Sequence, residues 1–308
     1  MTTAAIAVRN LRKDYAQTRA LKDINLELPA GEIVAIVGPD GAGKTTLLRI
    51  LAGILAFDAG EITLLGESLT AQRHKHRPTI GYMPQRFGLY EDLTVQENVD
   101  FFADLFLVRG AERRARIKRL LEFSRMDRFT ERLARNLSGG MKQKLGLACA
   151  LVHNPPILLL DEPTNGVDPV SRREFWRLLY DLNREGTTVV ISSSYMDEAE
   201  RAGRFVLLHD GTIISAGIPT EVRRDFPREV YELASDNARE LKAALVLRPE
   251  FESVVLFGRS LHLAAAPGFS PERIAAAVKT AGGSVEHLRR ITPSFEDIYI
   301  GLARRPHE

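Results

Sequence analysis

The sequence is poor in cysteine and has no long apolar run, and each shortage excludes a class of protein. A single cysteine among 308 residues excludes an internal disulfide and a metal cluster built from cysteines. That residue, Cys149, lies in the apolar stretch 145–152, so we expect a buried structural thiol. No uninterrupted apolar run approaches the ~20 residues that span a bilayer.

The chain also lacks an excess of charge of either sign. It has 42 Lys and Arg residues against 40 Asp and Glu residues, and a net charge of +2 supplies no strong attraction to nucleic acid. The first thirty residues have no signal-peptide pattern. With 44% hydrophobic and 27% charged residues, the composition is typical of a soluble globular protein, and the length suggests two domains. We therefore expect a cytoplasmic protein that reaches a membrane only through a partner.

A glycine-rich loop lies between an apolar strand, expected over 32–37, and a helix expected over 45–55. The loop comprises Gly38, Pro39, Asp40, Gly41, Ala42, Gly43, Lys44, Thr45 and Thr46. Backbone N–H groups of such a loop bind phosphate oxygens, and its glycines allow close approach and unusual dihedral angles. Lys44 is expected to reach the β- and γ-phosphates of a nucleotide, and the Thr45 hydroxyl to bind Mg²⁺. The alternative, a chance glycine turn, is disfavoured by the strand before it and the helix after it.

An Asp-Glu pair ends a second apolar strand that begins at Ile157. Because the strand places the carboxylates at the edge of the sheet, Asp161 is expected to hold Mg²⁺ through water. Glu162 is expected to be the base that polarises the attacking water. The alternative is a plain strand end without chemistry.

The order of elements predicts an α/β fold. Short strands are expected over 5–9 and 24–28, and another β-rich strand over 187–192. The segment from about 86 to 152 is mainly helical, and Thr94 with Glu97 is typical of a capping box. In the same segment, the basic run 113–119 is expected to be a solvated helix face, with contact to a membrane partner or acidic headgroups as the alternative. Trp176 is expected in the core.

The composition changes near Gly217, which predicts domains over 1–220 and 221–308. In the second domain the order is βαββαβ, which fits a small α+β split-βαβ sandwich, followed by a closing helix after Pro293. Its strands are expected over 229–234, 253–257, 260–265 and 284–289, and its helices over 237–246 and 271–281.

The sequence Leu-Ser-Gly-Gly, residues 137–140, lies between the glycine loop and the Asp-Glu strand. In this order the three motifs resemble those of the ATP-binding cassette (ABC) ATPases, whose two copies close head to tail over two ATP molecules. The resemblance covers residues 1 to about 220. The sequence Gly-Tyr-Met-Pro-Gln at 81–85 and the ending Ile-Thr-Pro-Ser-Phe-Glu-Asp-Ile at 291–298 resemble ATPase subunits of ABC-2-type exporters. These include the daunorubicin-resistance and YbhF types, and the likeness is greatest to the first ATPase half of the latter.

The resemblance implies a P-loop NTPase cassette with a mixed sheet core and a helical subdomain, and it implies ATP and Mg²⁺ as cofactors. Gln85 would bind Mg²⁺ and sense the γ-phosphate, and Tyr15 would stack on adenine. Ser138, Gly139 and Gly140 open a helix and would contact the γ-phosphate held by a second ATPase subunit. Asp168 would cross the dimer seam, or it is only a helix N-cap. For Gln85 and Tyr15 the alternatives are a solvated glutamine and an incidental loop tyrosine.

Two positions depart from the family pattern. Ser194 occupies the place of a histidine that contacts the γ-phosphate and the catalytic water, and Asp40 stands where asparagine is more common. A serine hydroxyl is shorter and neutral, so the resemblance implies a slower site on this chain, unless serine and a water suffice. His209 lies too far along the next strand to be an obvious substitute.

The resemblance implies an ATPase that powers export of a small molecule or drug through ABC-2-type transmembrane permease subunits on the inner face of the cell membrane. Its second ATPase subunit would be identical or different. One alternative is a soluble ABC ATPase that acts without a transporter, although the chain has neither a second cassette nor a long coiled coil. Another is a mainly regulatory, degenerate half of a heterodimer, against which intact Lys44, Asp161 and Glu162 argue.

Overall fold

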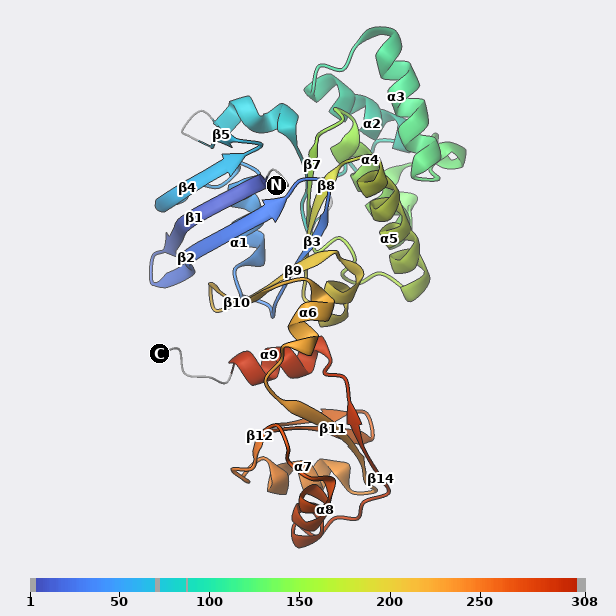
Figure 1. Cartoon of the computed structure of the whole chain (residues 1–308). Helices are drawn as coiled ribbons and strands as arrows, with labels where there is room; N and C mark the ends of the chain where they lie inside the picture. The colour runs from blue at the N-terminus through green and yellow to red at the C-terminus, as the bar shows by residue number, and fades with distance from the viewer. Residues whose placement is uncertain (1–3, 70–72, 87, 304–308) are drawn as a thin grey trace. The chain divides into compact units, whose positions relative to one another are not determined.

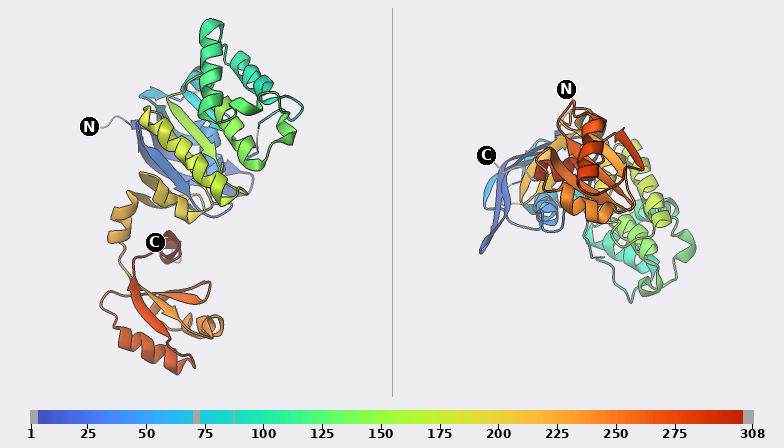
Figure 2. Two further views of the ribbon diagram at one scale, coloured as in Figure 1. Left: turned by 90° about the vertical axis from the view of Figure 1, so that its right-hand side faces the viewer. Right: turned by 90° about the horizontal axis from the view of Figure 1, so that it is seen from below.

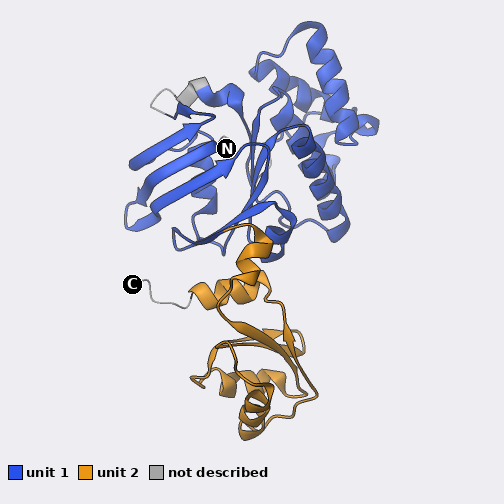
Figure 3. Cartoon of the chain, in the orientation of Figure 1, with its two compact units in different colours: residues 1–216 blue, residues 217–308 orange. Residues whose placement is uncertain are grey.

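The computed structural model describes residues 4–69, 73–86 and 88–303 (Figure 1). The chain divides into two compact units, Met1–Ala216 and Gly217–Glu308 (Figure 3). Each unit has its own cluster of buried apolar side chains, so each has the core that an independent domain requires.

A six-stranded sheet forms the centre of the first unit, in the order β10-β9-β3-β8-β7-β6. Its strands are β3 (Ile33–Val37), β6 (Ile80–Met83), β7 (Ile157–Asp161), β8 (Thr188–Ser193), β9 (Arg204–His209) and β10 (Thr212–Gly217). Strands β6, β7, β8, β3 and β9 run parallel to one another. Every residue of β3, β7 and β8 is buried, in keeping with the apolar residues that form most of their sequence. Helix α1 (Lys44–Leu51) covers one face, and α4 (Gly139–Leu151) and α5 (Pro169–Arg184) cover the other (Figures 1 and 2).

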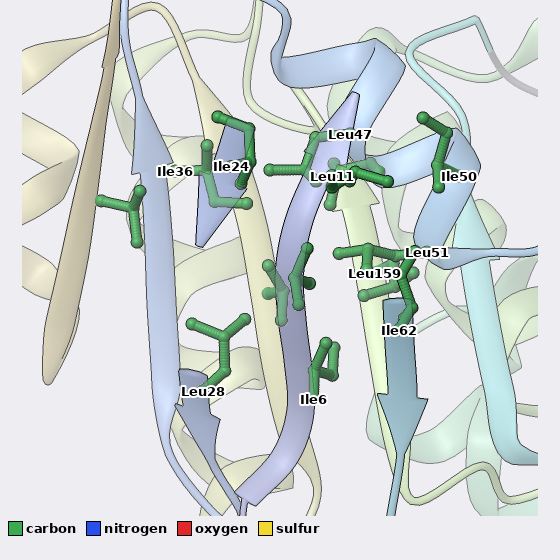
Figure 4. Packing of buried hydrophobic residues seen from close by; sticks show 14 of the residues in the cluster. Ile6, Leu11, Ile24, Leu28, Ile36, Leu47, Ile50, Leu51, Ile62 and Leu159 are labelled. Carbon is green, nitrogen blue, oxygen red and sulfur yellow. The ribbon is translucent and has the colours of Figure 1, made fainter. Parts of the chain in front are cut away.

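A second, antiparallel sheet lies against α1, in the order β2-β1-β4-β5. Its strands are β1 (Ala4–Tyr15), β2 (Thr18–Pro29), β4 (Ala59–Leu64) and β5 (Glu67–Ser68). Strands β1 and β2 are longer than predicted, because pairing continues to Tyr15 and Thr18, beyond the apolar residues. Helix α1 is shorter than predicted, because Gly53 takes a φ of +69° just after it and ends the helix. Side chains of this sheet, α1 and the central sheet, including Ile6, Leu47 and Leu159, form one core (Figure 4).

The predicted helical segment contains α2 (Val95–Leu105), α3 (Gly110–Phe123) and short 3₁₀ turns at Asp127–Phe129 and Ala134–Asn136 before α4. Further 3₁₀ turns occur at Arg73–Thr79 and Met196–Arg201. The capping box is confirmed: Thr94 Oγ1 accepts the N–H of Glu97 at 3.2 Å, and Glu97 Oε2 accepts the N–H of Thr94 at 2.8 Å. Cys149 and Trp176 are buried, as predicted.

The basic run on α3 is largely paired within the chain. Arg113 bonds to Asp100 at 2.7 Å, and Arg119 bonds to Glu185 at 2.7 Å. The Arg119–Glu185 pair is exposed, and such pairs contribute about 0–1 kcal/mol each, whereas Arg113 is partly buried. The pairing favours the solvated-face interpretation over contact with a partner.

The second unit contains the predicted order βαββαβ. Its elements are β11 (Glu229–Ala234), α7 (Ala238–Leu245), β12 (Phe251–Phe257), β13 (Ser260–Ala265), α8 (Pro271–Thr280) and β14 (His287–Ile291), with α6 (Pro219–Arg224) before them and α9 (Phe295–Ala303) after them. They form an antiparallel sheet ordered β12-β13-β11-β14. Strand β14 begins three residues later than predicted, since its pairing with β11 starts where His287 faces Ala234. Within the part of the chain that the structure describes, no helix combines the length and apolarity needed to cross a bilayer.

Candidate functional site

The order of the central strands brings the predicted motifs to one edge of the sheet. Strand β8 lies between β3 and β7, with Ser193 facing Val37 and Ser192 facing Asp161. The glycine loop follows β3, Glu162 follows β7, and Ser194 follows β8. Because parallel strands end at the same edge, these segments meet there although they are far apart in sequence.

The glycine loop is shaped by close contacts with its own chain. Gly43 has a φ of +106°, and a Cβ at this position would lie 2.7 Å from the carbonyl oxygen of Ala20. A Cβ on Gly38 would lie 2.2 Å from the carbonyl oxygen of Leu208. A side chain at either position would therefore displace the loop.

Lys44 lies inside this loop with only 4% of its side chain exposed. Its Nζ donates to the carbonyl oxygens of Gly38 at 2.8 Å and Pro39 at 3.0 Å. It also forms an ion pair with Glu162 Oε1 at 3.1 Å. The ammonium group is thus held at the loop by oxygens that a bound phosphate could replace.

A cleft of about 420 Å³ opens beside the loop. Nine of the site residues predicted from the sequence line this cleft: Asp40, Gly41, Ala42, Gly43, Lys44, Thr45, Thr46, Gln85 and Glu162. Four other predicted residues are hydrogen-bonded to this lining: Gly38, Pro39 and Ser194 to Lys44, and Asp161 to Thr45. A volume of this size falls within the range of small-ligand sites.

Asp161 is fully buried and surrounded by hydroxyl groups. Its Oδ1 accepts hydrogen bonds from Thr45 Oγ1 at 2.9 Å and Ser192 Oγ at 2.8 Å, and its Oδ2 accepts one from the Tyr82 hydroxyl at 3.4 Å. Burial, together with the negative charge of Asp161, raises the pKa of Tyr82 to about 12, so this phenol stays protonated at neutral pH. A hydroxyl and a carboxylate are hard oxygen donors, which fit Mg²⁺ shared with nucleotide phosphates.

Glu162 has both carboxylate oxygens occupied. Oε1 faces Lys44 at 3.1 Å and Ser194 Oγ at 2.8 Å. Oε2 accepts hydrogen bonds from Gln85 Nε2 at 3.0 Å and Asn165 Nδ2 at 3.1 Å. The backbone has a φ of +46°, which is uncommon for a residue with a side chain, and its N–H donates to Ser192 Oγ at 2.9 Å.

Sequence reasoning missed several residues of this site. Asn165 and Ser192 bind the two carboxylates, while Thr18, Arg19, Ala20, Lys22, Asp210 and Gly211 line the cleft. A signal was present for two of them: Asn165 follows Glu162 by three residues, and Ser192 is a polar residue at the end of an apolar strand. The other six come from neighbouring hairpins, which no motif identifies.

Four predicted residues lie at the starts of helices α4 and α5, away from the cleft. Ser138 caps α4 by accepting the N–H of Met141 at 3.4 Å, and Gly139 follows it on the surface. Asp168 caps α5 by accepting two backbone N–H groups at 3.0 Å, and hydrogen bonds from the side chain and backbone of Ser171 lower its pKa. The two helix starts are close together, because a Cβ on Gly140 would lie 2.6 Å from Ser171 Oγ.

Tyr15, the predicted adenine contact, ends β1 and has 44% of its surface exposed. It does not line the cleft, but it pairs with Thr18, which does. The Lys13 ammonium lies 5.4 Å from its ring centroid. The exposed ring therefore belongs to a residue whose cross-strand neighbour, Thr18, lines the cleft.

Protein-family models match both units of the chain. The ABC transporter model matches residues 21–165, and the model of the C-terminal domain of DrrA1-3-like ATP-binding proteins matches residues 217–303. The probable multidrug ABC transporter ATP-binding protein YbhF of Escherichia coli (strain K12) is 41% identical over 98% of this chain. The chain spans only 52% of that protein. The Nod factor export ATP-binding protein I of Rhizobium sp. (strain N33) is 33% identical over the full length of both chains.

Solved structures share the fold of the first unit. An ATP-binding subunit of an ABC transporter is similar with a TM-score of 0.65 and 30% identity, over 72% of this chain and 93% of that chain. A dimeric bacterial ABC transporter cassette is similar with a TM-score of 0.63 and 34% identity, over 69% of this chain and 98% of that chain. The full-length similarity shows that this chain belongs to the family of ABC transporter ATP-binding ATPase subunits.

Proposed function

We propose that this chain hydrolyses Mg·ATP in the cleft beside the glycine loop and thereby powers export of a small molecule through membrane partners. The observation that carries the proposal is the buried carboxylate of Glu162, which is held at the loop between Lys44, Gln85 and Asn165. A base, a phosphate-binding lysine and a metal-binding pair thus converge on one cleft.

The chemistry follows from the two oxygens of Glu162. Two amides, from Gln85 and Asn165, hold Oε2, so Oε1 is the oxygen that takes a proton. A phosphate at the loop competes for Lys44 and draws it away from Oε1. As water oxygen bonds to the γ-phosphorus and the bond to ADP breaks, Oε1 accepts the water proton. Lys44 and the loop N–H groups stabilise the charge on the transferred phosphoryl group.

Mg²⁺ would be held by the Thr45 hydroxyl, by Asp161 through water and by the Gln85 amide, together with nucleotide oxygens. When bound, it neutralises charge on the β- and γ-phosphates. The Tyr82 and Ser192 hydroxyl groups orient the Asp161 carboxylate from the protein side.

We further propose that the working unit contains two ATPase subunits and ABC-2-type permease subunits at the inner face of the membrane. The starts of α4 and α5, with Ser138, Gly139, Gly140 and Asp168, would face the nucleotide of the second subunit. Support comes from the export-related names of the relatives and from the dimeric cassette of similar fold. Nucleotide bound by both subunits closes the pair, and hydrolysis reopens it.

A second candidate is a mainly regulatory half of an unequal pair. It is favoured by Ser194, which offers one hydroxyl proton where the family pattern has an imidazole. In such a pair this chain would turn over slowly with its own loop, while its residues 138–140 complete a competent site on the partner.

The test compares Mg·ATP binding of the wild-type chain with that of Lys44→Ala by isothermal titration calorimetry. Loss of binding on substitution supports the cleft as the nucleotide site, whereas unchanged affinity and turnover overturn it. Purification of the tagged chain from its own membranes in mild detergent tests the partners. Recovery of transmembrane subunits supports transport, and recovery of ribosomes or DNA supports a function without a transporter.

A further inference from the structure

The Ser194 hydroxyl lies between three charged groups. Its Oγ is 2.8 Å from Glu162 Oε1, 2.9 Å from Asp40 Oδ1 and 3.2 Å from Lys44 Nζ. Both carboxylates are therefore at hydrogen-bond distance from a group that carries a single proton.

This arrangement follows from the sheet. Strand β8 has β3 on one side and β7 on the other. Asp40 lies three residues beyond the end of β3, and Glu162 lies one residue beyond the end of β7. The residue that follows β8, Ser194, is thus flanked by a carboxylate from each neighbour.

The donors are too few for the acceptors. Lys44 uses two of its three N–H groups on the carbonyl oxygens of Gly38 and Pro39. One lysine proton and one serine proton remain for Ser194 Oγ and two carboxylate oxygens. If the serine O–H donates to Glu162, it takes one of the two lone pairs of Oε1 and weakens the oxygen that the proposed reaction needs as a proton acceptor. If it donates to Asp40, that lone pair of Glu162 Oε1 remains available.

We propose that Asp40 is a positioning residue: it accepts a hydrogen bond from the Ser194 hydroxyl and so keeps Glu162 Oε1 available to the attacking water. The inference rests on the proposed ATP hydrolysis by Glu162. Asp40 is exposed, whereas Glu162 is only 7% exposed. In the proposal Asp40 orients the Ser194 hydroxyl, and Glu162 accepts the proton of the attacking water.

The test is a double-mutant cycle on the full chain, with Asp40→Asn, Ser194→Ala and both together. Asparagine has the shape of aspartate but is a weaker hydrogen-bond acceptor. In Asp40→Asn we therefore expect the Ser194 hydroxyl to donate its hydrogen bond to Glu162. We expect kcat of this variant to fall about tenfold, in line with a hydrogen bond to a charged group. Adding Ser194→Ala removes the misdirected proton, so the double variant is expected to recover several-fold over Asp40→Asn. A role of Asp40 in loop structure alone gives no such recovery.

Removing a negative charge near phosphates also changes ATP affinity, and the cycle separates this effect. The change in Kd for Mg·ATP caused by Asp40→Asn is expected to be equal in the wild-type chain and in the Ser194→Ala variant. Asp210→Asn is the matched control, because Asp210 lines the same cleft and its Oδ2 lies 3.7 Å from His209. Its effect on kcat is expected to be the same in both backgrounds.

The outcomes distinguish this inference from the function on which it rests. If Asp40→Asn lowers kcat equally in the wild-type chain and in the Ser194→Ala variant, the inference is overturned. The proposed ATP hydrolysis is then unaffected. A wild-type chain that fails to bind Mg·ATP overturns both. Recovery in the double variant, with the Kd changes matched, supports the positioning role.

Discussion

The buried carboxylate of Glu198 accepts a hydrogen bond from the Thr164 hydroxyl, with 2.8 Å between Oε1 and Oγ1. The same oxygen accepts Arg172 Nε at 2.6 Å and Trp176 Nε1 at 3.2 Å. One carboxylate thus joins the segment after Ser194 to the segment after Glu162 and to helix α5. The two sides of the candidate site are held together by an acid that is 0% exposed.

Glu198→Ala is expected to lower the free energy of unfolding by about 3–5 kcal/mol, because it leaves the Nε–H of Arg172, an indole N–H and a hydroxyl without their acceptor. Urea denaturation measures the loss. Asp197→Ala is the control, since Asp197 bonds to the same Arg172 at 3.1 Å but is exposed, and its cost should be about 0–1 kcal/mol. If the two variants lose the same free energy of unfolding, Glu198 does not stabilise the contact between these segments.

Glu162→Gln is expected to retain Mg·ATP binding and to lower kcat by roughly 10²-fold or more, because an amide cannot take the water proton. Bound but uncleaved ATP should then favour the closed pair of subunits. Light scattering with and without ATP measures the dimer, and phosphate release measures turnover. Full hydrolysis without any gain in dimer would rule out Glu162 as the base.

Ser194→His tests whether the serine limits the rate. Losing one hydrogen bond to the transferred phosphoryl group costs roughly 2–4 kcal/mol, or about 10²–10³ in rate, so histidine at this position should speed turnover. Asp40 would hold an imidazole at position 194 as it holds the hydroxyl, so we expect a smaller gain when Asp40→Asn is added. Steady-state kinetics of the single and double variants decide the matter. A fast wild-type enzyme that neither variant improves would show that serine is tolerated.

The half-buried His153 predicts a loss of stability in acid. Burial lowers the pKa of His153 to about 4, while its Nε2 contacts the Ile80 carbonyl at 3.1 Å and its ring stacks on Phe106. The folded state therefore stays neutral where the unfolded state takes a proton, so stability is present above pH 6.5 and is lost as pH falls toward 4. After discounting for partial exposure, we expect a loss of about 1 kcal/mol by about pH 5. In urea denaturation at about pH 7 and about pH 5, His153→Gln should lose less than the wild type, and an equal loss would contradict the assignment.

A chain that ends at residue 220 should bind Mg·ATP with a Kd within about threefold of the full-length value. Every residue that lines the cleft precedes Gly217, and the first unit has its own core. Circular dichroism establishes that the shortened chain is folded, and calorimetry measures binding. A folded fragment that does not bind would show that residues 221–308 take part in the nucleotide site.

Interactions between residues that are near in sequence made several features of this protein predictable. The glycine loop, the Thr94 capping box, the burial of Cys149 and the βαββαβ order of the second unit depend on neighbouring residues, and a single sequence displays these directly. The α/β cassette fold is confirmed. Errors in the predicted elements lay at their ends: the β1–β2 hairpin extends into polar residues because backbone pairing, unlike burial, needs no apolar side chains.

Only the tertiary structure decided how the site is connected. Asp40 and Ser194 are 154 positions apart, and Thr164 and Glu198 are 34 apart, so their contacts depend on the strand order β3-β8-β7 and on the packing of α5. The sequence by itself determined which chemical groups the chain carries and which strand each one follows. Which carboxylate meets which hydroxyl was decided by the arrangement of the strands, because hydrogen bonds form between neighbours in space.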